Sequence, residues 1–280
     1  MSKEFTKENV IQNKKEAIKS LNKLLEQYIN DSSTIHLKKA NLISYWIKDY
    51  VRLIDFEEKF EPTKNIAYKR GNVVKLNFGF NIGSEYGGLH YGIVIDNKNA
   101  HHSPVLTIIP LTSSDGIKKI HDNSVFLGNE LYRALKLKYD TISKTLDNEY
   151  DELVNTINVF SELVTLTDYT FHESASEDDP AKRTEKLIET QQLLDATQRI
   201  KQLYQEKSRH NQEQQAYLKK IGDEIARMKK GSIALVNQIT TVSKIRIFDP
   251  RNLKGILAGI SISPENMDKI NEKLKDLYVF

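Results

Sequence analysis

The chain has 280 residues, 39% of them hydrophobic and 28% charged, which is enough for one large domain or two modest ones with apolar cores. It contains no cysteine, which excludes a disulfide framework, thiolate catalysis and cysteine-ligated zinc. The net charge of +3 argues neither for nor against nucleic acid. No apolar segment approaches the ~20 residues that span a bilayer, and the first ten residues lack a signal core. We therefore expect a soluble, cytoplasmic protein that does not bind membranes.

Residues 1–62 form a predicted helical region in two pieces. Apolar residues recur at helical spacing from Ile18 to Ile29, and a polar break at Asn30–Thr34 separates them from a second apolar stretch, Ile35 to Ile54. The apolar side of the second helix is broad, so we expect it to pack on two neighbours. Pro62 ends the region, because the residue before a proline avoids the helical conformation.

The period changes to that of strands in residues 63–128. Two apolar runs, Val73–Phe80 and Tyr91–Asp96, flank a polar loop rich in glycine, and a third run, Val105–Ile109, ends in the hydroxyl-rich segment Pro110–Ser114. Polar groups where strands end are candidates for a functional site.

Residues 129–229 return to the helical period and form two arms. Apolar residues of the first arm lie seven apart, with a second track beside them: Tyr139, Leu146, Leu153 and Phe160, then Leu135, Ile142 and Leu163. The second arm has a less regular track: Leu187, Leu194, Ile200, Leu203, Tyr217, Ile221, Ile225 and Met228. The acidic segment His172–Pro180 is typical of a turn, so the arms predict an antiparallel, coiled-coil-like helical hairpin. The polar stretch Gln205–Gln215 is either solvated or faces a partner.

Residues 230–280 resume the strand pattern from Ser232 to Lys244 and end in a predicted helix. Ser263 is its expected N-cap, with Met267, Ile270, Leu274 and Leu277 on one face. The fold class is therefore α+β: the strands before and after the hairpin are halves of one small β domain, and the hairpin is an insertion.

Five motifs in order resemble the PemK/MazF family of endoribonuclease toxins. They are Lys69-Arg70-Gly71-Asn72-Val73-Val74, Gly83-Ser84-Glu85-Tyr86-Gly87-Gly88, Gly92-Ile93-Val94-Ile95-Asp96-Asn97, Pro110-Leu111-Thr112-Ser113 and the segment Ser232–Lys244. The resemblance covers residues 68–127 and 230–280. It implies a small SH3-like β-barrel, usually homodimeric, that cuts single-stranded RNA without a metal or cofactor and is restrained by an antitoxin protein.

The same resemblance implies the site residues. The substrate's 2′-hydroxyl attacks the adjacent phosphate, which requires a base, an acid and donors for the charged intermediate. Thr112 matches the family's catalytic threonine, with Ser113 beside it, and Glu85 and Gln238 match positions near the scissile phosphate, with Ser84 in the same loop. The family's arginine after the paired glycines is replaced by His90, which can accept or donate a proton near neutral pH.

Departures from the family pattern keep a second hypothesis open. Histidine lacks the permanent charge of arginine, and Asn237 and Thr240 replace an acid and an arginine of many relatives. Arg70 and Arg246 are candidates to supply the missing positive charge. The alternative function is a catalytically impaired barrel that binds RNA or protein through its hairpin; a third is a purely architectural helical protein.

Two further groups of residues favour ordinary surface roles. His101 and His102 near Asp96 lack the spacing of metal ligands, so we predict no metal site. The pairs Lys118–Lys119, Lys219–Lys220 and Lys229–Lys230 are typical of solvated faces, and an electrostatic path for RNA phosphates is the alternative.

Overall fold

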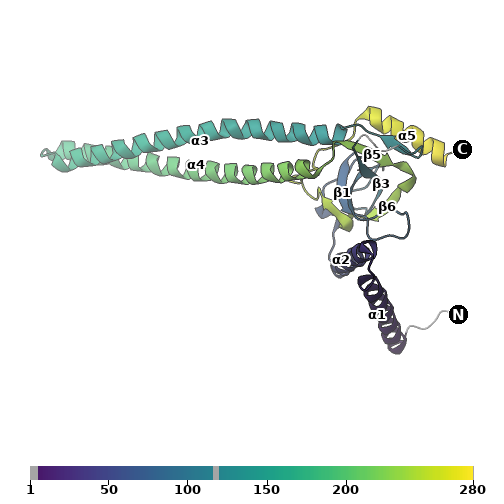
Figure 1. Ribbon diagram of the computed structural model, residues 1–280. Helices are drawn as coiled ribbons and strands as arrows, with labels where there is room; N and C mark the ends of the chain where they lie inside the picture. The colour runs from purple at the N-terminus through teal and green to yellow at the C-terminus, as the bar shows by residue number, and fades with distance from the viewer. Residues whose placement is uncertain (1–5, 116–119, 280) are drawn as a thin grey trace. The chain divides into compact units, whose positions relative to one another are not determined.

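The computed structural model describes residues 6–115 and 120–279, so the predicted pair Lys118–Lys119 lies outside the described residues (Figure 1). The elements in chain order are α1 (Lys7–Ile29), α2 (Thr34–Glu57), η1 (Pro62–Lys64), β1 (Val73–Asn77), β2 (Leu89–Val94), β3 (Val105–Ser114), β4 (Ser124–Phe126), α3 (Glu130–Ser176), α4 (Pro180–Arg227), β5 (Gly231–Leu235), η2 (Val236–Gln238), β6 (Thr240–Ser243), η3 (Lys244–Arg246), β7 (Ile247–Asp249) and α5 (Pro264–Tyr278). This mixture of helices with an antiparallel sheet confirms the predicted α+β class.

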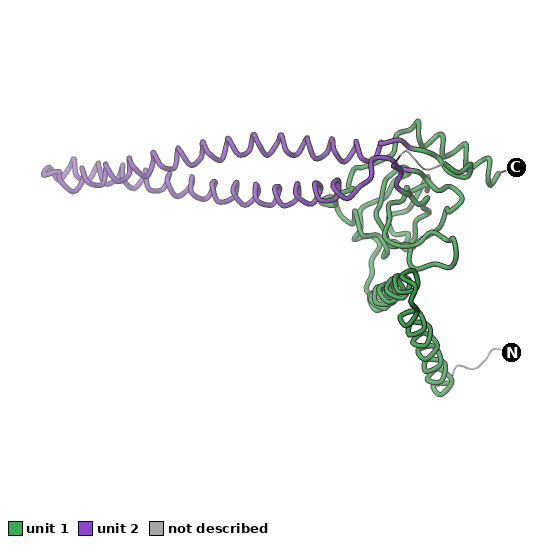
Figure 2. Tube along the Cα trace, in the orientation of Figure 1, with its two compact units in different colours: residues 1–112, 119–126, 233–280 green, residues 113–118, 127–232 purple. Residues whose placement is uncertain are grey.

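The chain divides into two compact units (Figure 2). One contains residues 1–112, 119–126 and 233–280, and the other contains residues 113–118 and 127–232. The first unit holds the small sheet with α1, α2 and α5, and the second holds the helical pair α3 and α4.

The sheet of the first unit curls back on itself. Strand β1 pairs antiparallel with β2, β2 with β3, and β3 with β6. The short 3-10 turn η3 then carries the chain from β6 into β7, which pairs with β1 on its other edge. The strands thus form the closed circuit of a small SH3-like barrel, and β4 and β5 extend the sheet beyond β3.

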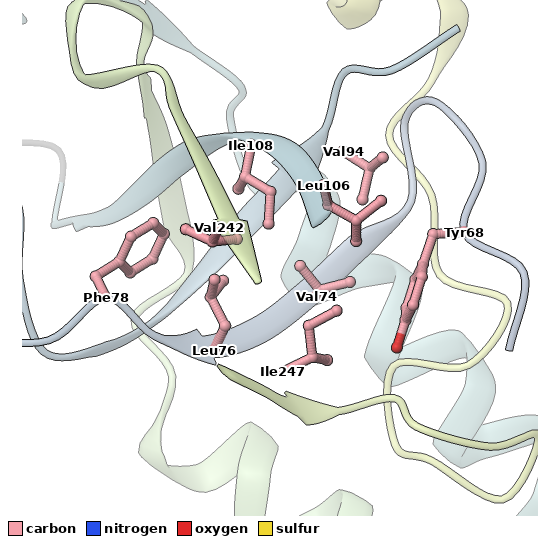
Figure 3. Close-up of a cluster of buried hydrophobic side chains, with 9 residues drawn as sticks. All are labelled: Tyr68, Val74, Leu76, Phe78, Val94, Leu106, Ile108, Val242 and Ile247. Carbon is pink, nitrogen blue, oxygen red and sulfur yellow. The ribbon is translucent and has the colours of Figure 1, made fainter. Parts of the chain in front are cut away.

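Alternating residues of these strands fill the barrel (Figure 3). The buried cluster consists of Tyr68, Val74, Leu76, Phe78, Val94, Leu106, Ile108, Val242 and Ile247. Tyr68 brings its one polar atom into this core, and its hydroxyl donates to the Pro250 carbonyl at 2.7 Å. The polar atom is satisfied, so the ring stabilises the core without an unpaired buried group.

Two strand predictions need correction. The pattern from Ser232 to Lys244 is not one strand, because η2 interrupts it after Leu235 and places Gln238 in a turn. Strand β3 does not stop at Ile109 but continues to Ser114, with Pro110 paired to Gly92 across the sheet. Thr112 and Ser113 therefore lie within a strand rather than after it.

The two N-terminal helices form as predicted, and α2 packs on two neighbours as expected, α1 and the barrel, although little of its apolar side is buried. Within α2 only Ala40 and Ile43 are buried. The rest of its apolar side is largely exposed: Leu42, Tyr45, Tyr50, Val51 and Ile54. Its contact with the barrel is made by Trp46 and Asp49, whose carboxylate accepts from the Asn77 amide at 3.2 Å.

In the second unit α3 and α4 pack side by side as an antiparallel hairpin (Figure 1). The first-arm track lies at the contact, where Leu135 and Leu146 are buried. The predicted contact track of the second arm is partly wrong, because three of its residues do not face α3 but are exposed: Leu187, Leu194 and Leu203. Polar residues of α4 face α3 in their place, as the contact between the Thr197 and Thr167 hydroxyls at 3.4 Å shows.

The remaining helix predictions agree with the structure. Ser263 caps α5 by accepting from the Asn266 N–H, and Met267 and Ile270 are buried on one face. Asn211, within the polar stretch Gln205–Gln215, is buried. Across residues 6–115 and 120–279, no helix has the length and apolarity required to cross a membrane.

Candidate functional site

The glycine-rich loop between β1 and β2 is a closed, ordered hairpin connection. Two backbone hydrogen bonds form its neck: Phe78 N–H donates to the Gly88 carbonyl at 2.8 Å, and Gly88 N–H donates to the Gly79 carbonyl at 2.7 Å. Gly79 has a φ of +96°, and a Cβ there would lie 3.0 Å from the Trp46 ring. Only glycine satisfies both the conformation and the close approach of the indole.

Gln238 holds this loop from the turn η2. Its amide oxygen accepts from the Tyr86 N–H at 3.2 Å, and its amide nitrogen donates to the Ser84 carbonyl at 3.3 Å. Inside the loop, the Asn81 amide donates to the Tyr86 carbonyl at 2.8 Å. Both the oxygen and the nitrogen of the Gln238 amide bond to the loop backbone, so Gln238 holds the loop in place. We call this pair of hydrogen bonds the loop clamp.

Glu85 also bonds within the loop. Its carboxylate accepts from the Ile82 N–H at 3.3 Å, and the side chain is exposed. Glu85 also lines two cavities beside the loop.

His90 lies on β2 directly after the loop and opposite Leu76 of β1. Its ring contacts the Tyr86 ring, with centroids 4.8 Å apart and planes tilted by 49°. The residue is exposed overall, but the burial of part of its ring disfavours the charged form and lowers the pKa of His90. A neutral imidazole at pH 7 is able to accept a proton.

Tyr86 connects His90 to Thr112. The Tyr86 hydroxyl donates to the Leu111 carbonyl at 2.6 Å, and the Thr112 side chain hydrogen-bonds the same phenol. Burial raises the pKa of Tyr86 to about 12, although the bond from Thr112 acts in the opposite direction. The phenol is therefore protonated at every physiological pH.

Two cavities of the first unit are lined in part by residues of the loop. One, of about 400 Å³, is lined by Glu85, Tyr86, Gln238 and Arg246, and by the β6 segment 240–243. The other, of about 820 Å³, is lined by Glu85, His90 and residues of α1 and α2. Glu85 and Asn81 line both cavities, so a chain molecule crossing the loop would contact both sides of the site.

The two candidate arginines lie at different ends of the barrel. The Arg246 guanidinium donates to the Phe78 carbonyl at 3.2 Å and lies 5.4 Å from the centre of the Trp46 ring, at the loop neck. Arg70 donates to the Ile95 carbonyl and to Asn271 of α5. Ile95 comes directly after β2, five residues beyond His90, which is roughly 16 Å at the rise of a strand. Arg246, but not Arg70, brings positive charge to the loop.

The remaining predicted residues lie on the periphery. Ser84 is exposed at the loop tip, where its carbonyl accepts from Gln238. Ser113 is exposed on β3 and falls in the second compact unit. Among the predicted site residues, the structure brings together Glu85, His90, Thr112, Gln238 and Arg246.

Sequence reasoning missed Tyr86 and Trp46. Tyr86 lies between Glu85 and the paired glycines. An aromatic residue in a loop of small and polar residues could have indicated that Tyr86 belongs to the site. Trp46 is the single tryptophan of the chain, but its helical spacing predicted only packing. Its contact with Gly79 depends on tertiary structure that no local pattern reveals.

The histidine pair near Asp96 is occupied by ordinary contacts. His101 Nε2 lies 2.7 Å from the Asn65 carbonyl, and the Asp96 carboxylate accepts from the Thr107 N–H at 2.8 Å. Among the residues that the structure describes, no three His, Cys, Asp or Glu side chains are grouped as a metal would need.

The fold and the site define a class of protein. It is an α+β protein with a small antiparallel barrel, and a histidine, a tyrosine, a threonine and an arginine lie in or beside its β1–β2 loop. The family model described as "PemK-like, MazF-like toxin of type II toxin-antitoxin system" matches residues 69–158. This part of the chain is therefore similar to that toxin family, in agreement with the resemblance found in the sequence. The match spans β1 to β4 and the first part of α3. No curated protein matches the chain.

Proposed function

We propose that this protein is a toxin-type endoribonuclease that cleaves single-stranded RNA by attack of a 2′-hydroxyl on the adjacent phosphate. Toxins with this domain are in general endoribonucleases restrained by an antitoxin, so an antitoxin protein is the expected partner. The observation that carries the proposal for this chain is the contact of His90, through Tyr86, with Thr112 at the loop.

His90 is the proposed general base. Its lowered pKa keeps the ring neutral, so it accepts the proton of the 2′-hydroxyl as the 2′-oxygen bonds to phosphorus. As the bond between phosphorus and the 5′-oxygen breaks, that oxygen takes a proton from solvent, which gives a 2′,3′-cyclic phosphate and a 5′-hydroxyl. The His90 imidazolium then returns its proton to solvent. Atoms and charge balance without a redox partner.

Thr112, Tyr86 and Arg246 are the proposed electrostatic partners of the phosphate. The Thr112 side chain hydrogen-bonds the Tyr86 hydroxyl, and the Tyr86 ring contacts the His90 ring. Arg246 supplies a permanent charge on the cavity lined by Glu85 and Gln238. A guanidinium here compensates for the family arginine that His90 replaces, because charged donors stabilise the developing phosphorane.

A short unstructured RNA panel, incubated with purified protein and a chelator, tests the proposal. We expect fragments ending in cyclic phosphate, identified by mass spectrometry, and their loss in His90→Ala and Thr112→Ala. Ser113→Ala, on the same strand but exposed, is the matched control and should retain cleavage. Intact RNA at high protein concentration would overturn the enzyme hypothesis.

One observation favours the second candidate function, a barrel that binds RNA or protein without cutting. Glu85 and Gln238 both bond the loop's own backbone, so two residues expected near the phosphate have a structural role as well. If the barrel only binds RNA, the RNA panel stays intact and its mobility shifts in a gel-based binding assay. His90→Ala then changes neither the intact RNA nor the shift.

A further inference from the structure

The α3–α4 hairpin has a contact seam that is poor in apolar residues over its distal half. Inward positions of α3 follow an alternating spacing of three and four, as in coiled coils. From residue 149 to 174 they are Glu149, Leu153, Thr156, Phe160, Leu163, Thr167, Thr170 and Ser174. More than half are polar, and the buried Thr156 and Thr170 hydroxyls bond only to carbonyls of their own helix. This seam contributes little hydrophobic stabilisation between the helices.

The neighbouring face of the hairpin is more apolar than the seam. On α3, every seventh residue beside the seam is apolar and exposed, and two residues of α4 hold the equivalent positions. We call these six residues the outer stripe: Tyr150, Ile157, Val164, Phe171, Leu187 and Leu194. Each exposes between 41% and 58% of its surface.

The stripe is continuous across both helices. In an antiparallel pair, equivalent heptad positions flank the same side of the seam. The Thr167–Thr197 contact and the Lys186–Glu173 ion pair at 3.6 Å fix the register, which sets Leu187 and Leu194 level with the stretch from Val164 to Phe171. The opposite flank contains Val159, Leu166 and Leu203, but Glu152, Glu189 and His210 interrupt it.

The two helices carry opposite charge along this stretch. Residues 150–176 of α3 contain five acidic side chains and no lysine or arginine, whereas residues 180–207 of α4 contain six basic and four acidic ones. If a second hairpin packed on the stripe with its α3 against α3 of the first copy, the acidic side chains of the two α3 helices would face and repel each other. A two-fold axis running along the hairpin instead places α3 over α4 of the second copy, where the charges attract.

We propose that the outer stripe is a self-association surface, and that two copies of this chain pair their hairpins into a four-helix bundle with α3 against α4 of the second copy. Because each of these side chains is about half exposed, the six residues of both copies would bury on the order of 1,000 Å², which is the lower threshold for a specific interface. The surface lies wholly in the second unit and does not depend on RNA cleavage.

Cysteine cross-linking tests the geometry directly, because the chain has no cysteine of its own. Full-length Val164→Cys protein is mixed with Leu194→Cys protein and oxidised. We expect a disulfide-linked dimer, because the two-fold axis brings these positions to the same level. Val159→Cys mixed with Leu203→Cys, on the other flank, is the matched control. Equal or no cross-linking in the two mixtures would overturn the proposal.

The mass of the assembly in solution provides a second measurement. It remains informative if the chain also forms a dimer contact outside the hairpin. Ile157→Glu/Leu187→Glu should halve the assembly mass of the full chain by light scattering, whereas Val159→Glu/Leu203→Glu, at matched exposures of 43% and 47% against 44% and 41%, should not. Circular dichroism checks that both variants keep their helices. An unchanged mass in the folded stripe variant would contradict the proposal and leave a different protein as the occupant.

Discussion

The Tyr86 and His90 rings lie 4.8 Å apart at a tilt of 49°, and this contact joins the loop to the strand that follows it. Tyr86 is at the same time fixed by Gln238 through its N–H and bonded to Leu111 through its hydroxyl. The environment of the proposed base is therefore set by a residue that the loop holds in place.

Replacing His90 should remove most of the activity. A positioned general base contributes typically 10²–10⁴-fold to a rate, so His90→Ala should lower the cleavage rate by about that factor. The measurement is single-turnover cleavage of one RNA oligonucleotide. His102→Ala, an exposed histidine on the far loop, should cleave at the rate of the unaltered protein. A His90→Ala rate within twofold of that value would exclude His90 as the base.

The pH profile should respond to Tyr86. Burial lowers the pKa of His90, so the rate should rise with pH along an acid limb whose midpoint lies below the ordinary histidine value of 6.5. In Tyr86→Ala the ring regains solvent, its pKa rises, and the acid limb should move to higher pH. Tyr86→Phe keeps the ring contact and should leave the limb in place. A limb that does not move in Tyr86→Ala would show that Tyr86 does not set the titration.

Loss of the loop clamp should loosen the site without unfolding the barrel. Gln238→Ala removes two hydrogen bonds, each worth about 1 kcal/mol at most on a partly exposed group. Amide exchange at Tyr86 should accelerate by roughly tenfold, and cleavage should fall with it. Asn237→Ala, the exposed neighbour on the same turn, should change neither quantity. Unaltered exchange at Tyr86 in Gln238→Ala would show that the clamp is dispensable.

Local spacing predicted the strands, the hairpin and the two N-terminal helices because each depends on a periodic pattern, whereas the barrel was implied by the family resemblance. The sequence placed Glu85 in the loop correctly, but His90, also expected there, lies on β2 directly after the loop. It did not predict the role of Tyr86, because the partners of that residue come from residues 111 and 238, far along the chain. The α4 track failed for a related reason: leucines spaced by seven indicate a stripe but not which of two stripes faces α3.

Trp46 should be essential for the conformation of the loop neck. Gly79→Ala places a Cβ 3.0 Å from the indole and also strains a φ of +96°, whereas Gly83→Ala strains a φ of +64° in open space. Strain of this kind costs about 1 kcal/mol, so Gly83→Ala should lower the free energy of unfolding by that amount. Gly79→Ala should lower it by about 1–3 kcal/mol more and change the fluorescence of the single tryptophan. Equal denaturant midpoints for the two variants would argue against a tight Trp46–Gly79 contact.

The buried Lys244 should make stability depend on alkaline pH. Its side chain is 1% exposed, and its ammonium donates to the Ala100 and His101 carbonyls, both at 3.2 Å. Burial lowers its pKa, although Asp96 acts against the shift, so the unfolded chain binds more protons between the lowered value and 10.5. In that window the contribution of Lys244 to the unfolding free energy becomes more favourable as pH rises. Urea unfolding from pH 7 to 10 should show this slope in the unaltered protein and lose it in Lys244→Met. That variant should also be less stable at pH 7 by about 1–2 kcal/mol, because the Ala100 and His101 carbonyls lose the hydrogen bonds from the ammonium. A Lys244→Met protein with the original slope would assign the pH dependence to another group.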